Sequence, residues 1–198
     1  MSSTTPDSLS YSGQEEMFRA ISCAVSSKSA TYISGPITTG LNFVNWYADK
    51  LKRNIPNEIN YRDALRNNVI RPNEIKILEL AEHWRSTQRG TVIEPASLYI
   101  EAWSQDDFIK FWLGVLDRFV RTVVLVEGWQ YSAGCVAEYN FSRSHGHLIL
   151  SHFGEPIDRA AAVQLINAAA FEVEKKSNGD EVLLRLAQNL RANIDQES

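Results

Sequence analysis

One short segment, EGWQYSAGCVAE at residues 127–138, gathers side chains of the kinds that bind and react. Ser132 is a residue type that caps helices, so its hydroxyl and the amides that follow it could bind an anion. Glu138 lies six residues later, roughly 9 Å along a helix axis, and its side chain leans back toward the helix start. A carboxylate there could act as a nucleophile or stabilise an oxocarbenium-like centre. The spacing therefore suits a phosphate and a reactive sugar carbon in one cleft.

Two aromatic residues, Trp129 and Tyr131, lie just before this serine. Their rings could stack on a base, or they could pack in the core or at an interface, as large aromatic side chains commonly do. Glu138 could likewise be an ordinary solvated glutamate on a helix surface. The segment alone leaves a binding role and a packing role open for each of these side chains.

A second segment, SGPITTG at residues 34–40, has the composition of an anion-binding loop. Its glycines, threonines and serine directly precede a helical pattern, so backbone amides of the loop and of the helix start could hold an anion. The segment lacks the lysine of a Walker A loop and the spacing of a dinucleotide-binding fingerprint. An ordinary strand-to-helix turn has the same composition, and on its own the loop favours that simpler interpretation.

Apolar runs and helical periodicity predict the elements that hold these two segments. Because the strands are continuous apolar runs that alternate with helices, we predict a parallel sheet covered on both faces. Ligands bind at the carboxyl ends of such strands, where both segments fall. Strands are predicted within ATYIS, TVIEP, Thr122–Val126 and HLILSHF, and helices at 14–27, 42–55, 72–89, 104–120, 133–144, 156–176 and 180–194.

Length and charge restrict the class of protein. The 198 residues predict a flexible arm at 1–13, an α/β domain at 14–154 and a C-terminal helical extension at 155–198. The net charge of -4 argues against a nucleic-acid polymer or an anionic membrane as the main partner. We expect a cytoplasmic protein, since we identify no signal peptide and no apolar stretch of transmembrane length. Two cysteines, Cys23 and Cys135, do not suggest a disulfide framework.

Two further patterns in the sequence suggest possible sites. His145, His147 and His152 surround the last predicted strand, and histidines at i and i+2 point to one side, so a metal is conceivable. With no nearby cysteine or paired acid we predict no metal site. The alanine-rich segment at residues 158–173 either packs on the sheet or forms an oligomer face.

The segments YISGPITTG, GTVIEPASL and VVLVEGWQYSAGCVAEYN together resemble the nucleoside 2-deoxyribosyltransferase-like superfamily. The resemblance spans roughly residues 30–150 and is nearest to its nucleoside 5′-monophosphate N-glycosidase branch. It implies a Rossmann-like three-layer α/β fold with a mainly parallel sheet of four or five strands, here with extra C-terminal helices. It also implies cleavage or transfer at an N-glycosidic bond without a metal or other cofactor, in a homodimer or higher homo-oligomer.

The resemblance assigns roles to individual residues. Glu138 matches the catalytic glutamate. Ser132, in the pattern S-x-G-x-x-x-E with Gly134, matches the phosphate site of the monophosphate hydrolases, whereas transferases of free nucleosides tend to have aspartate there. A carboxylate at that position would repel a phosphate, so the physics agrees. The first strand and loop supply the remaining matches, namely Tyr32, Gly35, Pro36, Ile37 and Thr38.

One position departs from the family pattern. Relatives usually have an aspartate about eight residues before the third strand, where this chain has Leu113. Asp117 is the least distant of the neighbouring acids and is taken here as the candidate partner of Glu138. We therefore expect hydrolysis of a nucleoside 5′-monophosphate to base and sugar phosphate, with Trp129 flanking the base. A nucleotide-binding sensor without turnover and deoxyribosyl transfer between free nucleosides are the alternatives.

Overall fold

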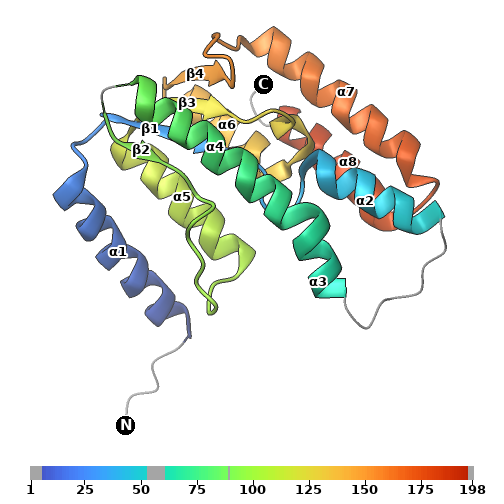
Figure 1. Cartoon of the computed structure of the whole chain (residues 1–198), viewed down its shortest axis with the longest axis horizontal. Helices are drawn as coiled ribbons and strands as arrows, with labels where there is room; N and C mark the ends of the chain where they lie inside the picture. The colour runs from blue at the N-terminus through green and yellow to red at the C-terminus, as the bar shows by residue number, and fades with distance from the viewer. Residues whose placement is uncertain (1–5, 53–60, 89, 196–198) are drawn as a thin grey trace.

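The computed structural model describes residues 6–52, 61–88 and 90–195 of the chain. Its centre is a sheet of four parallel strands in the order β2-β1-β3-β4, flanked by helices (Figure 1). This arrangement confirms the predicted Rossmann-like three-layer α/β fold with extra C-terminal helices. The strands are β1 at Ala30–Ser34, β2 at Val92–Ile93, β3 at Val120–Leu125 and β4 at Leu148–Ser151.

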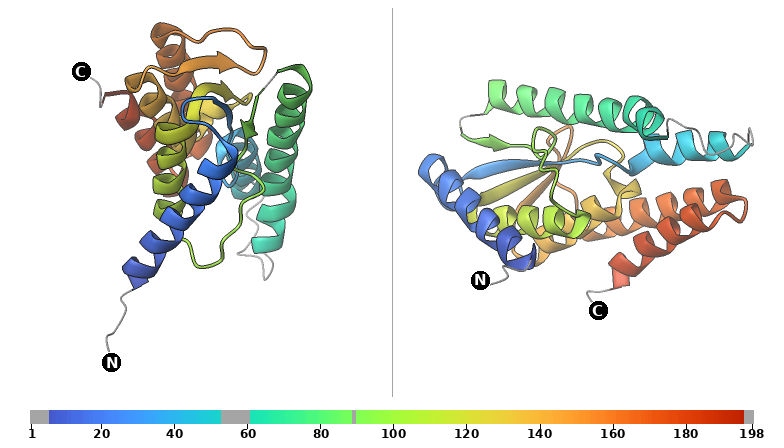
Figure 2. Two further views of the ribbon diagram at one scale, coloured as in Figure 1. Left: turned by 90° about the vertical axis from the view of Figure 1, so that its left-hand side faces the viewer. Right: turned by 90° about the horizontal axis from the view of Figure 1, so that it is seen from below.

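Most helices lie where the apolar periodicity predicts them, but the first begins eight residues earlier than expected and the helical segment at 61–70 was not predicted. Figure 2 shows α4 on one side of the sheet and α5, with α1 beside it, on the other. The helices are α1 at Pro6–Ala24, α2 at Gly40–Lys52, α3 at Tyr61–Leu65, the π-helical turn η1 at Arg66–Ile70, α4 at Arg71–Thr87, α5 at Gln105–Phe119, the 3₁₀ turn η2 at Trp129–Tyr131, α6 at Ala133–Ser144, α7 at Arg159–Ser177 and α8 at Glu181–Asp195.

A separate hydrophobic core fills each side of the sheet, because side chains alternate between the two faces of a strand. On the α4 side, Ile33 and Val124 pack against Ile77 and Trp84. The other core is larger and includes residues of α1, α2, α5, α6, α7 and α8. The C-terminal helices α7 and α8 pack against each other, and α8 also packs against α6. The C-terminal extension is thus part of the main core.

Side-chain caps define several helix ends. Ser104 begins α5 with a capping box, in which its hydroxyl accepts from the amide of Asp107 and the Asp107 carboxylate accepts from the amide of Ser104. Asp158 caps α7, with its carboxylate accepting from the amide of Ala161. The helix predicted from Pro156 begins three residues later, because Pro156 forms an antiparallel bridge with Leu150 of β4.

The N-terminal boundary was predicted wrongly. The helix expected from residue 14 begins at Pro6, so residues 6–13 belong to α1 and not to an arm. Residues 1–5 of the expected arm lie outside the described residues. Strand β2 is only two residues long, since Pro95 has no amide to donate to a neighbouring strand. Within the described residues, no helix has the length and apolar character needed to cross a membrane.

The tight packing of the loop after β1 leads to a stability prediction. A Cβ at buried Gly35 would lie 2.6 Å from Cγ1 of Ile77 and 2.8 Å from Cγ2 of Val126. Gly35→Ala must therefore push the sheet and α4 apart, and we expect it to lower the free energy of unfolding by about 1–3 kcal/mol. Urea unfolding monitored by circular dichroism measures this change.

Gly13→Ala is the matched control, because Gly13 lies in α1 and a Cβ there meets no atom within 4 Å. It should stabilise the helix by up to about 1 kcal/mol. A Gly35→Ala protein as stable as the wild type would contradict the close packing of this loop.

Candidate functional site

The two candidate loops meet at the carboxyl ends of β1 and β3, which are neighbours in the middle of the sheet. From β1 the chain goes to β2 on one side, then crosses to β3 on the other, so the direction of winding reverses between β1 and β3. Open α/β sheets bind ligands at such a switch point. The sequence therefore predicted correctly where these two loops lie.

Glu138 reaches from α6 back to β1. The hydroxyl of Tyr32 donates to one carboxylate oxygen at 2.9 Å, and the hydroxyl of Ser34 donates to the other at 2.6 Å. Both donors are fully buried, with 0% exposed area. Tyr32 and Ser34 are two residues apart on one strand, so they share a face. The carboxylate is thus held at a defined place at the end of the sheet.

This environment sets the protonation of Glu138. Burial raises its pKa to about 7, and the hydrogen bonds from Ser34 and Tyr32 offset the rise only in part. A carboxyl group that titrates near neutral pH can serve as a base or as an acid. Burial, together with the negative charge of Glu138, raises the pKa of Tyr32 well above its usual value, so Tyr32 stays a neutral donor. Glu138 as a whole residue is partly exposed, whereas its carboxylate is surrounded by protein atoms.

Ser132 caps α6, as predicted. Its hydroxyl oxygen accepts from the amide of Cys135 at 3.4 Å and from the hydroxyl of Thr39 at 2.9 Å. Ser132 is buried, with 3% exposed area, and it joins the two candidate loops directly. Because the oxygen already accepts twice, a phosphate would have to receive the proton of the Ser132 hydroxyl.

The rest of the first loop combines buried and accessible residues. Gly35 and Pro36 are buried, Ile37 is partly buried, and Thr38 is exposed with its side chain available to a ligand. Gly134 lies in the first turn of α6 and is partly exposed. The structure thus brings the first loop, Ser132, Gly134 and Glu138 to the same end of the sheet.

Asn73 holds this loop in place. Its amide nitrogen donates to the carbonyl oxygens of Ile37 and Thr39, each at 2.9 Å, and its amide oxygen accepts from Asn42 at 2.8 Å. Asn73 is 3% exposed, so leaving any of these groups unpaired would be costly. No local pattern in the sequence indicates this role, because the partners are more than 30 residues away.

Trp129 does not occupy the position expected of a base-stacking residue. It is 3% exposed, and its ring lies 5.1 Å from the ring of Tyr139 inside the core. The packing alternative is therefore correct for Trp129. Its site in the 3₁₀ turn places the side chain against α6 instead of in the space above the strands.

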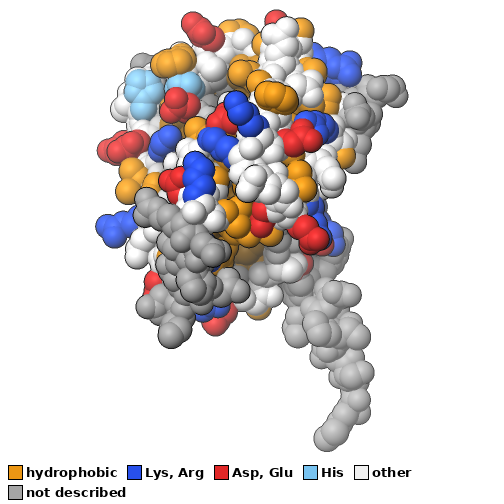
Figure 3. All heavy atoms as spheres, turned by 90° about the vertical axis from the view of Figure 1, so that its right-hand side faces the viewer, with side chains coloured by type: hydrophobic (Ala, Val, Ile, Leu, Met, Phe, Trp, Pro, Cys, Tyr) orange, Lys and Arg blue, Asp and Glu red, His pale blue; other side chains and the backbone are white. Residues whose placement is uncertain are grey.

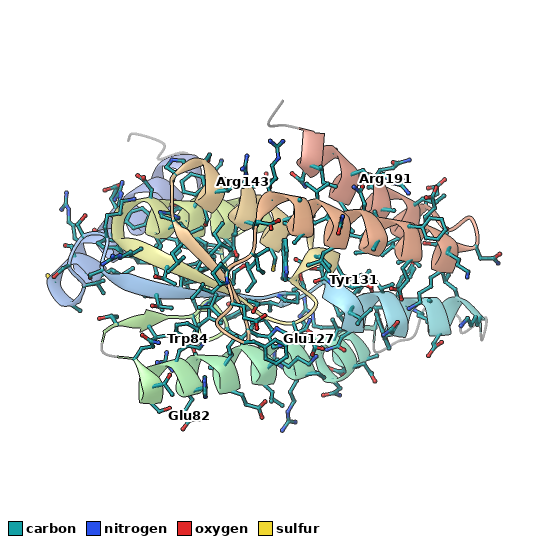
Figure 4. All side chains as sticks on the ribbon, turned by 90° about the horizontal axis from the view of Figure 1, so that it is seen from above. Glu82, Trp84, Glu127, Tyr131, Arg143 and Arg191 are labelled. Carbon is teal, nitrogen blue, oxygen red and sulfur yellow. The ribbon has the colours of Figure 1, made fainter. Side chains whose placement is uncertain are left out.

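Tyr131 connects the site to the C-terminal extension. Figure 4 shows it between α2 and α7. Its hydroxyl donates to Glu172, which also accepts from Lys176 at 2.6 Å, and Lys176 donates to Asn45 at 2.7 Å. Burial and the hydrogen bond to Glu172 raise the pKa of Tyr131 to about 12. The loop that precedes Ser132 is therefore anchored to α7, and through α7 to α2.

The assignment of Asp117 as the partner acid was wrong. Asp117 lies in the last turn of α5 and pairs with Lys28 at 3.8 Å. A helix that leads into a strand ends at the amino edge of the sheet, whereas Glu138 lies at the carboxyl edge. Sequence distance to the next strand could not reveal this, because it does not tell the two edges apart.

At the correct edge, Glu94 follows β2 and contributes to the raised pKa of Tyr32, although its carboxylate accepts from Ser97.

Two of the histidines near β4 pack against aromatic rings. No group of three or more histidine, cysteine, aspartate or glutamate residues suited to a metal occurs among the described residues. His145 stacks on Phe141, with the ring centroids 3.9 Å apart.

Cys135 is buried, and burial raises the pKa of its thiol to about 12, so it stays protonated at neutral pH.

Comparisons of the chain with protein-family models, with curated proteins and with solved structures found no match. The resemblance to nucleoside 2-deoxyribosyltransferase-like proteins therefore rests on the three sequence segments that suggested it.

The raised pKa of Glu138 predicts how stability changes with pH. A carboxyl group whose pKa rises on folding contributes stability below its unfolded value of 4.5, and this contribution is lost as the pH rises through the folded value of about 7. Between pH 5 and pH 8 the wild type should thus lose about 2 kcal/mol of unfolding free energy relative to Glu138→Gln. Urea titrations of both proteins at the two pH values measure the difference, which should be near zero if the carboxylate is solvated.

Proposed function

We propose that the chain cleaves the N-glycosidic bond of a nucleoside 5′-monophosphate, with Glu138 as the reacting carboxylate. The observation that carries the proposal is the pair of hydrogen bonds that hold Glu138 at the switch point of the sheet. A surface glutamate would not be buried with two dedicated donors from a neighbouring strand. The arrangement suits a group whose charge and direction matter to a reaction.

The chemistry follows from the position of the carboxylate. Ionised Glu138 attacks the sugar C1′ or stabilises the positive charge that develops there as the bond to the base breaks. Water then adds its hydroxyl to C1′, which breaks the bond to Glu138 where one has formed, and the proton of the water goes to the departing base. Tyr32 and Ser34 orient the carboxylate. Because their hydrogen bonds already stabilise its charge before the reaction begins, their main contribution to the reaction is to position the carboxylate.

A phosphate fits best beside the first loop and the start of α6. Thr38 is exposed there, the Ser132 hydroxyl caps the start of α6, and the amino end of α6 favours negative charge. An aspartate in place of Ser132 would oppose this charge. The presence of serine at position 132 also disfavours transfer between free nucleosides as the main activity.

A nucleotide-binding module without turnover is the second candidate. The observation that favours it is the position of Asp117, which pairs with Lys28 away from Glu138 and cannot protonate a leaving base. Hydrolysis then depends on another proton source, such as Glu94 or water, or on a base that leaves without protonation.

The decisive experiment incubates the protein with a panel of nucleoside 5′-monophosphates and follows the free base by chromatography. We expect base release by the wild type and a loss of at least about 100-fold in Glu138→Ala. Asp117→Ala should keep the wild-type rate and is the matched acidic control. Binding of a nucleotide without release of base would establish the module instead of the enzyme.

Two further measurements test the assigned roles. Because Glu138 must be ionised to attack, the rate should rise with pH around its pKa of about 7. Ser132→Asp should weaken binding of a monophosphate far more than binding of the matching nucleoside, because a second negative charge repels the phosphate. Equal effects on both ligands would refute the phosphate assignment.

A further inference from the structure

A cavity lies on the opposite face of the sheet from the Glu138 side chain. Its volume is about 450 Å³, and it lies between the last turns of α4, the strands β1, β3 and β4, and the loop after β4. Pockets for small ligands commonly have about 300–1,000 Å³. On β1, the neighbours Thr31 and Tyr32 point to opposite faces, one toward this cavity and the other toward Glu138.

The cavity exists because α4 covers only part of its face. This helix makes most of its strand contacts with β1 and β2, and the part of the face that it leaves open, over β3 and β4, carries Thr122 and the exposed Leu148. Thr31, Thr122 and Leu148 are register partners across three strands and form one row of the floor. Figure 4 shows Trp84 on α4 turned toward the sheet and Glu82 turned away from it.

Several hydrogen-bonding side chains line this cavity. Within the described residues, no side-chain hydrogen bond involves the hydroxyls of Thr31 and Thr122, the amide of Gln88, or the imidazoles of His83 and His152. All of these groups except a protonated imidazole both donate and accept. Among the described residues that line the cavity, none carries a carboxylate, ammonium or guanidinium group. The chemistry of the cavity is that of a neutral, polar ligand.

Aromatic side chains supply flat surfaces beside these groups. Trp84 forms part of the wall, and Phe153 stands at the rim with 78% of its area exposed and its ring 3.9 Å from that of His152. The loop that carries Phe153 stays close to Trp84, since a Cβ at Gly154 would lie 3.9 Å from the indole ring. Offset stacking on such rings favours a planar ligand over an aliphatic one.

We propose that this cavity binds a neutral, planar heteroaromatic molecule of the size of a nucleobase. Its edges exchange hydrogen bonds with Thr31, Thr122 and Gln88, and its ring lies beside Trp84 and Phe153. The proposal does not depend on the reaction assigned to Glu138, because the cavity shares no lining residue with that site.

The test is calorimetric titration of the full chain with adenine as the probe. We expect a Kd near or below about 1 mM, a range reasonable for a ligand of about ten non-hydrogen atoms. Thr122→Val keeps the shape of the strand residue and removes one hydroxyl, and Phe153→Ala removes an exposed ring. Each should weaken adenine binding by roughly five-fold.

Controls separate this cavity from the Glu138 site and from simple hydrophobic uptake. Glu138→Gln and Ser132→Asp should leave adenine binding at the cavity unchanged, and cyclohexanol should bind at least ten times more weakly than adenine. The proposal is overturned if adenine does not bind at 10 mM, if cyclohexanol binds equally well, or if Thr122→Val and Phe153→Ala bind adenine as the wild type does. Loss of binding in Glu138→Gln would assign the adenine to the other site and equally overturn it.

Discussion

The hydrogen-bonded carboxylate of Glu138 is the interaction on which the site depends. A buried carboxyl group is tolerated only where donors replace the water it loses, and here β1 supplies both donors. This requires α6 to lie close to the carboxyl end of β1. The cap at Ser132 sets where α6 begins, and its contact with Thr39 fixes that point relative to the first loop. The cap, the helix and the strand therefore position one side chain together.

The loops at this site are held by polar contacts that come from distant parts of the chain. Asn73 on α4 fixes the loop after β1, and Glu172 on α7 fixes the loop after β3 through Tyr131. Surface loops without such contacts are commonly the most mobile parts of a fold. The C-terminal helices thus stabilise the geometry of the site, even though they lie outside residues 30–150, on which the sequence-based prediction of the site rested. Basic and acidic side chains are interspersed on the face toward the viewer in Figure 3.

Short-range sequence patterns predicted the fold well, whereas the sequence contains no pattern that identifies contacts between distant residues. Helical and strand periodicity located the parallel sheet, and residue types at strand ends located Ser132 and Glu138. The period of two along β1 already placed Ser34 beside Tyr32, so this donor could have been found from the sequence. Trp129 and Asp117 were misplaced for a different reason. Whether an aromatic ring is buried, and which edge of the sheet an acid occupies, depends on how whole elements pack.

The two faces of β1 explain why one short strand can serve two different environments. Tyr32 and Ser34 face α6 and hold a charge, whereas Thr31 and Ile33 face α4. A shift of one residue in register would exchange these sets and bury Glu138 against apolar side chains. The register with β3 is therefore under strong constraint, and β3 supplies apolar partners on both faces. On the α4 face this constraint does not extend to Thr31 and Thr122, because these two register partners line the cavity.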